Sequence, residues 1–381
     1  MKILCVDIGT GTQDILLFDS RLHPENSFKL VVPSPTMMVR RQLQTATRND
    51  QSVLLTGVTM GGGPSHWAAE DHLKAGGTLY ATPTAARSFN DDLDYIQSTG
   101  IQLVSEDEAR RLPDEVVRIT LRDFDFGAVQ RALAEFGVGL ADLAAVAVAV
   151  FDHGNAPPHI SDRRFRFDYI AQRIQADPRL STFAFRAENI PEIMTRMQAV
   201  AASARDVDAP LVLMDTAPAA VAGALLDPMG NGRSPHLVAN IGNLHTLAFR
   251  MNENSIEGTF EHHTGMLDGD KLTGLLRELA AGTLKNEAVF MDQGHGALIV
   301  EPEPFELPED DFGVVITGPR RMMMQHSPLR PYFAAPYGDM MVAGCFGLLT
   351  AVADKLPHLA EPVWAALRDG KGRPPWEIGV G

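Results

Sequence analysis

Apolar and polar positions fall into blocks along the chain, and the first blocks predict a strand, a turn and a second strand. Residues 3–6 and 15–18 are short apolar runs of the kind that form buried strands. The polar stretch 7–13 between them holds two glycines, which allow a tight turn and a close approach of the backbone to a ligand. The turn is therefore either a phosphate-binding turn, in which backbone N–H groups hold the anion, or a plain hairpin turn.

Other blocks predict further strands and helices. Apolar runs that predict strands occupy 30–32, 52–57, 116–121, 144–150, 211–214, 236–241, 246–251 and 312–317. Helical periodicity or small-residue runs predict helices over 126–136, 191–205, 219–226, 272–281 and 338–353. In the first of these helices we expect Phe136 to join Val129 and Leu133 on the buried face. The stretch 157–186, rich in Arg and aromatic residues, predicts an irregular insertion.

The opening strand–turn–strand pattern returns in the second half of the chain. Asp7-Ile8-Gly9-Thr10 has a counterpart in Asn240-Ile241-Gly242-Asn243, and both lie between two apolar runs. A glycine-rich loop at 59–64 either wraps a ligand or simply ends a strand. The repeated hairpin indicates two related halves.

Composition and charge narrow the class of protein. The 381 residues are enough for two or three domains, and 45% hydrophobic with 21% charged residues is typical of a globular protein. A net charge of −15 argues against nucleic acid as a partner. No apolar run reaches the length of a membrane helix, and the N-terminus lacks the pattern of a signal peptide. Cys5 and Cys345 are too few for a disulfide framework, so we expect a cytoplasmic location and no membrane partner.

Five segments, in order, resemble the nucleotide-binding elements of the actin-like ATPase superfamily, which includes sugar kinases, acetate kinases and heat-shock chaperone ATPases. They are 7–19 (first phosphate motif), 215–226 (first connecting helix), 239–249 (second phosphate motif), 314–321 (adenosine motif) and 338–349 (second connecting helix). The resemblance covers nearly the whole chain. It implies an α/β fold with two actin-like, ribonuclease H-like domains and a nucleotide cleft between them. The domains would be 1–222, with insertions, and 223–357, followed by a peripheral tail at 358–381.

More narrowly, the sequence resembles a bacterial and archaeal family whose members are often labelled "putative pyruvate formate-lyase activating enzyme". Such activators need a radical-SAM Cys-x₃-Cys-x₂-Cys triad, and the sequence has none. Two thiolates also fall short of the four that a cluster generally takes. We therefore predict that the chain is not a radical-SAM activating enzyme.

The superfamily resemblance implies ATP and Mg²⁺ as cofactors and assigns residues to them. Asp7 and Asp215 would hold the metal ion and its water ligands, with Asn240 standing where the second motif usually has Asp. The residues expected to contact the nucleotide are Gly9, Thr10, Gly11, Thr12, Gln13, Asn240, Gly242, Asn243, His245, Gly318 and Arg320. Pro319, Arg320 and Arg321 replace the small residues usual in the adenosine turn, and either arginine could stack on a base or reach a phosphate.

Two polar residues follow the buried Ala/Val run at 144–150. Asp152 or His153 is the expected general base for an acceptor hydroxyl, with a turn cap as the alternative for Asp152. A group of arginines, Arg163, Arg164 and Arg166, is expected either to bind an anionic substrate or to form surface ion pairs.

Glu261, His262 and His263, with His245 nearby in sequence, form a candidate metal cluster. Adjacent histidines on a strand face opposite sides, so a structural role is favoured over a shared metal ion.

Two functions follow, in different classes. The first is a Mg²⁺-dependent, ATP-binding phosphotransferase or ATPase, a kinase-like transferase acting on a small metabolite. The alternative is a nucleotide-gated regulator or activator of a partner protein, with little turnover of its own. A degenerate fold that binds another phosphate-bearing ligand is a third reading. The expected partners are a nucleotide and a small-molecule substrate; a protein partner and a homodimer are left open.

Overall fold

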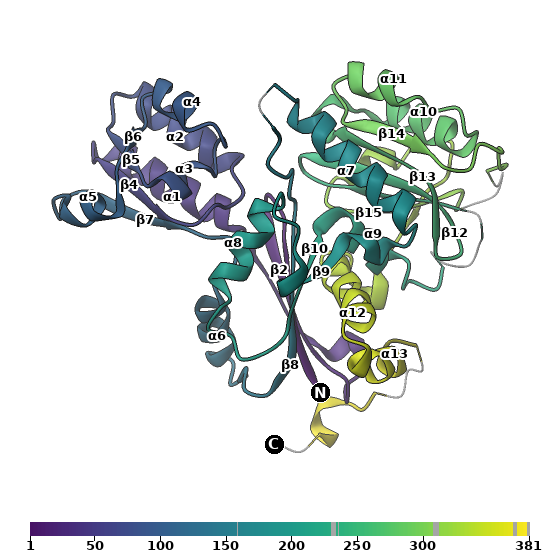
Figure 1. The fold of residues 1–381 in the computed structure, drawn as a ribbon. Helices are drawn as coiled ribbons and strands as arrows, with labels where there is room; N and C mark the ends of the chain where they lie inside the picture. Colours follow the sequence, from purple (N-terminus) through teal and green to yellow (C-terminus); the bar gives the residue numbers. More distant parts are fainter. Residues whose placement is uncertain (158, 230–233, 235, 308–311, 369–371, 379–381) are drawn as a thin grey trace.

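The computed structural model describes the chain except for residues 158, 230–233, 235, 308–311, 369–371 and 379–381. Within the described residues, three β-sheets are flanked by helices in a mixed α/β arrangement (Figure 1). The first sheet has the order β3 (Phe28–Pro33), β2 (Thr12–Asp19), β1 (Lys2–Ile8), β8 (Leu143–Val150), β10 (Leu211–Asp215), β9 (Ala184–Arg186). The second has the order β14 (Gly296–Ile299), β13 (Ser255–His263), β12 (His245–Asn252), β11 (His236–Ile241), β15 (Val314–Thr317), β16 (Tyr332–Phe333).

These two sheets repeat one topology. In the first, β1, β2 and β3 are antiparallel neighbours, and β8 and β10 follow in parallel to β1. In the second, β11, β12 and β13 are antiparallel, and β15 and β16 follow in parallel to β11. The two halves that the hairpin motif indicated are therefore present as two sheets of the same design.

Helices cover both faces of each sheet, because each sheet has apolar residues on both sides. On the first sheet, α6 (Phe126–Ala134) and α8 (Thr195–Ser203) cover one face, and α12 (Ala343–Lys355) and α13 (Ala360–Arg368) cover the other. On the second, α7 (Asp162–Ala176) and α9 (Thr216–Ala224) cover one face, and α10 (Gly269–Ala280) and α11 (Asn286–Met291) cover the other. The apolar side chains between these layers form the core.

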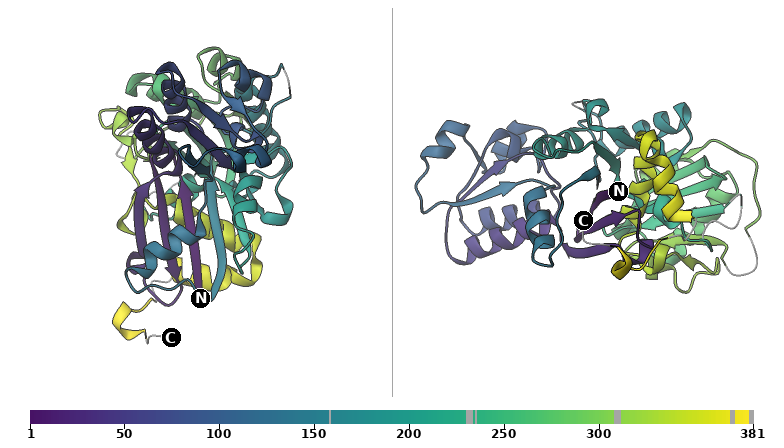
Figure 2. Two further views of the ribbon diagram at one scale, coloured as in Figure 1. Left: turned by 90° about the vertical axis from the view of Figure 1, so that its left-hand side faces the viewer. Right: turned by 90° about the horizontal axis from the view of Figure 1, so that it is seen from below.

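The third sheet belongs to an inserted unit between β3 and β8. Its four parallel strands have the order β6 (Gln102–Leu103), β5 (Leu79–Ala81), β4 (Val53–Gly57), β7 (Val117–Leu121). The helices of this unit are α1 (Pro35–Arg48), α2 (Pro64–Lys74), α3 (Pro83–Ala86), α4 (Leu93–Ser98) and α5 (Glu106–Arg111). The unit has its own apolar core and lies at the opposite end of the molecule from the second sheet (Figure 2).

Helices α9 and α12 cross at very short range and join the two main sheets. A β-carbon added to Gly223 would lie 1.8 Å from the carbonyl oxygen of Ala343, and one added to Gly347 would lie 1.8 Å from the carbonyl oxygen of Ala219. Only glycine fits at both positions. The two small-residue segments, which the sequence places in the two connecting helices, therefore pack against each other.

Several expectations about elements need correction. Residues 157–186 are not irregular: they contain α7, whose buried face (Arg166, Phe167, Ile170, Ile174) is hidden among charged residues in the sequence. Phe136 is 73% exposed, because α6 ends at Ala134 before the turn reaches it. The segment after residue 357 is not wholly peripheral, since Val363 on α13 is fully buried in the core of the first sheet.

The packing also crosses the predicted domain boundaries 1–222 and 223–357. Helix α7, from the first range, packs on the second sheet, while α12 and α13 pack on the first sheet. No helix among the described residues is long and apolar enough to cross a membrane.

Candidate functional site

A cleft of about 980 Å³ opens where the two main sheets and the inserted unit meet. Many residues predicted for the site line it: Asp7, Gly9, Thr10, Gly11, Thr12, Asp152, His153, Asn240, Gly242, Asn243, His245 and Gly318. These residues come from strand ends and turns of both main sheets. The sequence motifs therefore converge on one cavity.

The two hairpin turns have matching backbone geometry. In the first, the N–H of Gly9 donates to the carbonyl oxygen of Thr12 (2.9 Å); in the second, the N–H of Gly242 donates to that of His245 (2.9 Å). The turns face each other, since a β-carbon added to Gly11 would lie 3.0 Å from Nδ2 of Asn243. Both turns line the same cavity, and glycine turns of this kind are a common source of backbone N–H groups for an anion.

Asp7 lies at the end of β1 and faces the cleft. Its Oδ1 accepts a hydrogen bond from the hydroxyl of Thr216 (2.6 Å), and a β-carbon on Gly344 would lie 1.9 Å from its Oδ2. Burial raises the pKa of Asp7 to about 7, with the charge of Asp215 acting in the same direction and the Thr216 hydroxyl opposing both. The anionic form of this carboxylate would gain from a cation.

Asp14 on β2 pairs directly with Asp7 across the hairpin and also lines the cleft. Burial and the neighbouring Asp7 raise the pKa of Asp14 to about 8. Its Oδ1 is buried without a hydrogen-bond partner among the described residues. Two adjacent carboxylates with one unsatisfied oxygen fit a hydrated divalent cation, because hard cations take oxygen ligands and water.

Asp215, the other predicted metal ligand, has different surroundings. Its Oδ2 accepts from Nη1 of Arg166 (2.7 Å), its Oδ1 caps the first turn of α9, and it does not line the large cleft. Arg166 also donates from Nε to both oxygens of Glu261 (2.9 and 3.0 Å) and from Nη1 to the carbonyl oxygen of Asp152 (2.7 Å). Asp215 is thus paired with a buried arginine that links β10 of the first sheet to β13 of the second.

Asp152 has the geometry of a turn cap. Its Oδ1 accepts from the N–H of Gly154 (2.9 Å) and its Oδ2 from the N–H of Met197 (2.8 Å). Burial raises its pKa, and both backbone N–H groups oppose the rise. Both oxygens are therefore engaged, which favours the cap over the general base, whereas the neighbouring His153 is exposed to the cleft.

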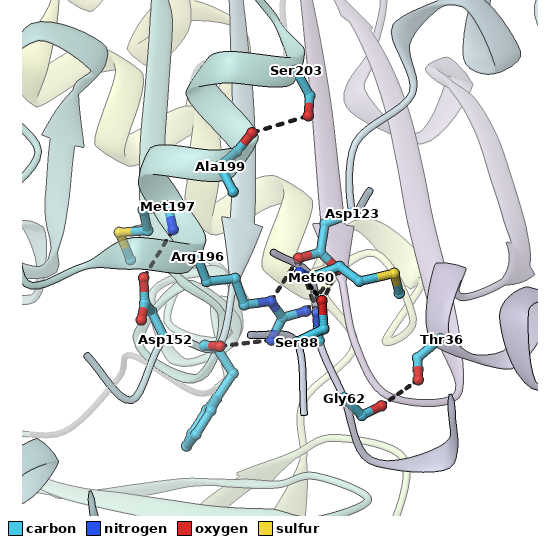
Figure 3. A network of polar contacts seen from close by, with 12 residues as sticks. Thr36, Met60, Gly62, Ser88, Asp123, Asp152, Arg196, Met197, Ala199 and Ser203 are labelled. Carbon is cyan, nitrogen blue, oxygen red and sulfur yellow. Dashed lines mark hydrogen bonds and ion pairs between the residues drawn. The ribbon is translucent and has the colours of Figure 1, made fainter. Parts of the chain in front are cut away.

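The glycine-rich loop at 59–64 lines the cleft and is braced from the first sheet (Figure 3). Arg196 on α8 donates to both carboxylate oxygens of Asp123 (2.7 and 3.0 Å) and to the carbonyl oxygen of Phe151 (2.6 Å). The same carboxylate accepts from the N–H of Gly61 (3.2 Å). The loop, which follows the end of β4, therefore forms a wall of the cavity that is held by hydrogen bonds.

Two other predicted nucleotide contacts lie outside the cleft lining. Gln13 alternates with Thr12 and Asp14 along β2, and its side chain donates to the carbonyl oxygen of Pro33 (3.3 Å). Arg320 is exposed, and its backbone N–H donates to the carbonyl oxygen of Ile241 (3.0 Å). The turn before it does reach the cavity, because Gly318, with φ of 97°, and Pro319 both line it.

The histidines near residue 262 separate as strand alternation predicts. The ring of His262 contacts Asp292 (3.2 Å), while that of His263 lies 5.1 Å from the ring of His245 on the neighbouring strand β12. His262 and His263 therefore do not share one site.

Sequence reasoning missed three residues at this site: Asp14, Thr216 and Gly344. Asp14 was detectable from alternation, since it lies on the same strand face as Thr12. Thr216 and Gly344 acquire their roles only by contacting Asp7 across the fold.

The two cysteines lack the features of reactive thiols. Cys5 and Cys345 are buried, and burial raises the pKa of both thiols. Sγ of Cys345 donates to the carbonyl oxygen of Asp14 (3.0 Å).

Comparison with known proteins identifies a family and finds distant similarity to solved structures. No curated protein sequence matches the chain. Among solved structures, the crystal structure of an exopolyphosphatase-like protein is similar at 11% sequence identity and a TM-score of 0.23, over 83% of this chain and 65% of that protein, too weakly for an argument about fold or function. The family model described as "Putative pyruvate format-lyase activating enzyme (DUF1786)" matches residues 60–323, so the chain belongs to the DUF1786 family.

Proposed function

We propose that this protein has the actin-like ATPase fold and is a Mg²⁺-dependent, ATP-binding phosphotransferase or ATPase that acts on a small metabolite. The observation that carries the proposal is the pair of matching hairpin turns, at Gly9 and Gly242, that face each other across one cleft. Two sheets of one topology around a shared cavity are what the superfamily resemblance implies.

Different cleft residues would have different roles in phosphoryl transfer, which depends on positioning and charge neutralisation. The backbone N–H groups of the two turns would hold the phosphates. Asp7, with Asp14 beside it, would hold hydrated Mg²⁺, and Thr216 fixes the carboxylate of Asp7 from the opposite side. Gly318 and Pro319 would border the nucleoside. Asp215 orients Arg166 in this proposal, so it holds no metal ion.

The proposal does not depend on either predicted general base. Asp152 uses both oxygens to cap backbone N–H groups. Asn240, which takes the place of Asp7 in the second hairpin, brings no charge to the metal. Both observations are also compatible with the alternative function, a nucleotide-gated regulator of a partner protein. Such a regulator binds ATP but turns it over slowly.

Thermal unfolding tests the binding step. A ligand that binds only the folded state raises its stability by mass action. We expect Mg²⁺ with ATP to raise the melting temperature above that with Mg²⁺ alone, in a comparison that includes ADP and GTP. Asp7→Asn should abolish the rise, and Gln13→Ala, a neighbour outside the cleft, should retain it. A rise that persists in Asp7→Asn, or no rise with any nucleotide, would contradict the proposal.

Turnover then separates the two functions. Release of ADP that increases with a small-molecule acceptor supports the phosphotransferase. Nucleotide binding without ADP release, together with one stoichiometric protein in the purified material, supports the regulator.

A further inference from the structure

Four histidines from distant parts of the sequence gather beside the second hairpin turn. His153 follows β8, His245 begins β12, His263 ends β13 and His295 precedes β14. Their ring centroids are 4.8–6.2 Å apart in the pairs that are in contact. Only tertiary folding brings these rings together, since they come from both main sheets and from a loop.

His295 is a buried histidine whose ring nitrogens are free to bind a metal ion. It is 1% exposed, and neither of its ring nitrogens has a hydrogen-bond partner among the described residues. A buried polar group without a hydrogen-bond partner destabilises the folded protein, and a ligand that binds this ring would remove that cost. Its ring lies 5.1 Å from that of His245 and 6.2 Å from that of His153.

We propose that His153, His245 and His295 bind one divalent transition-metal ion of the Zn²⁺ type at the edge of the cleft. One ring nitrogen from each of the three lies within 4.8 Å of the others. Tetrahedral Zn²⁺ with nitrogen ligands at about 2.0–2.1 Å needs nitrogens about 3.3 Å apart, so small rotations of the side chains close the set. Three imidazoles leave a fourth position for water, as in open zinc sites.

The surroundings of the three rings support an ion of this class. Imidazole suits Zn²⁺ and its neighbours in the transition series better than Mg²⁺, which prefers oxygen ligands. Each neutral imidazole offers a metal ion the lone pair of one ring nitrogen, Nδ1 or Nε2. The nearby cation Arg166 is paired with two carboxylates, Asp215 and Glu261, so this buried group does not add net positive charge.

Packing behind the rings holds their orientation. Phe151 is sandwiched: the guanidinium carbon of Arg166 lies 3.7 Å from its ring centroid, and the ring of His245 stacks on it at 4.0 Å. His153 and His245 line the cleft, whereas His295 lies behind them and is not among the lining residues. The proposed site would therefore lie in the wall of the cavity, next to the turn at Gly242.

Metal titration without nucleotide tests this site separately from the proposed function. The metal-free protein is titrated with Zn²⁺ by calorimetry, and with Co²⁺ while its visible absorption is recorded. We expect one ion per chain and the intense absorption of tetrahedral Co²⁺. His295→Gln and His153→Gln should each weaken binding about 100-fold or more, because losing one of three ligands exceeds the 10- to 100-fold effect of an outer-shell partner. His358→Gln, an exposed histidine elsewhere, should bind as the parent does.

The two ligand variants guard against a folding artefact. His153 is exposed, so His153→Gln should unfold at the parent's temperature in the absence of metal even if the buried His295→Gln does not. No binding of either ion by the parent would overturn the proposal. So would binding that His153→Gln and His295→Gln leave unchanged, because it would show that the ion sits elsewhere. Neither result bears on the response to ATP and Mg²⁺ or on Asp7→Asn, which test the proposed function.

Discussion

Gly344 and Asp7 are in contact although they lie near opposite ends of the chain: a β-carbon on Gly344 would be 1.9 Å from Oδ2 of Asp7. The hydroxyl of Thr216 holds the other oxygen of that carboxylate at 2.6 Å. The first turn of α12 and the beginning of α9 therefore fix the direction of Asp7 in the cleft. A helix from the end of the sequence thus shapes a site whose motif lies at its beginning.

The first prediction concerns this contact. Gly344→Ala should displace the carboxylate of Asp7, lower the stability of the ligand-free protein by about 1–3 kcal/mol through overpacking, and reduce the rise in melting temperature given by Mg²⁺ and ATP. Gly265→Ala, which has no atom within 4 Å of the added carbon, is the control. A variant with an undiminished nucleotide response would show that the position of this carboxylate does not matter for binding.

The second prediction concerns the crossing of α9 and α12. Gly347→Ala should destabilise the protein by about 1–3 kcal/mol or more, because the added carbon would lie 1.8 Å from the carbonyl oxygen of Ala219. The exposed Gly274 on α10 has nothing within 4 Å, so Gly274→Ala should stabilise by up to about 1 kcal/mol through helix propensity alone. Chemical denaturation measures both. Two changes of the same sign would count against the close crossing.

The third prediction is a pH dependence caused by Asp14. Its pKa of about 8 in the folded protein exceeds the ordinary value of 3.8, so the folded state holds this proton more tightly than the unfolded state does. The corresponding stability is fully present below about pH 4 and is lost as pH rises through about 8. Asp14→Asn should remove this decline and make the metal-free protein more stable than the parent at pH 8. Denaturation between pH 5 and 9 measures the difference between the two slopes. Parallel slopes for parent and variant would contradict the raised pKa.

The fourth prediction separates a buried ion pair from an exposed one on the same helix. Arg166→Met should destabilise by about 3–5 kcal/mol, because it leaves Asp215 and Glu261 buried without their partner. Arg164→Met, which removes an exposed pair with Glu287 at 3.1 Å, should cost no more than about 1 kcal/mol. Equal costs for the two variants would mean that Arg166 does not join the sheets as its hydrogen bonds indicate.

Most of the strands and both hairpins could be predicted from the sequence, because each hairpin depends on neighbouring residues: an apolar run, a glycine turn, and a second apolar run. The strands β5, β6, β9, β13, β14 and β16 were not predicted. The paired motifs at Asp7 and Asn240 were enough to predict two related sheets, and residues 144–150 were enough to predict a buried strand; both are confirmed. The narrower resemblance, to the family often labelled "putative pyruvate formate-lyase activating enzyme", is confirmed, whereas the superfamily resemblance stays a prediction.

Only the tertiary structure decided which side chains share an environment, because contacts between distant segments leave no local pattern. From the sequence, Arg166 was expected either to bind an anionic substrate or to form a surface ion pair. It is instead buried between two carboxylates that lie tens of residues further along the chain. Asp215, a predicted metal ligand, has one oxygen paired with the same arginine, and two backbone N–H groups donate to the oxygens of Asp152. His295 lies in no recognisable sequence motif. It became a candidate metal ligand only because the folded sheets place three other histidine rings beside it.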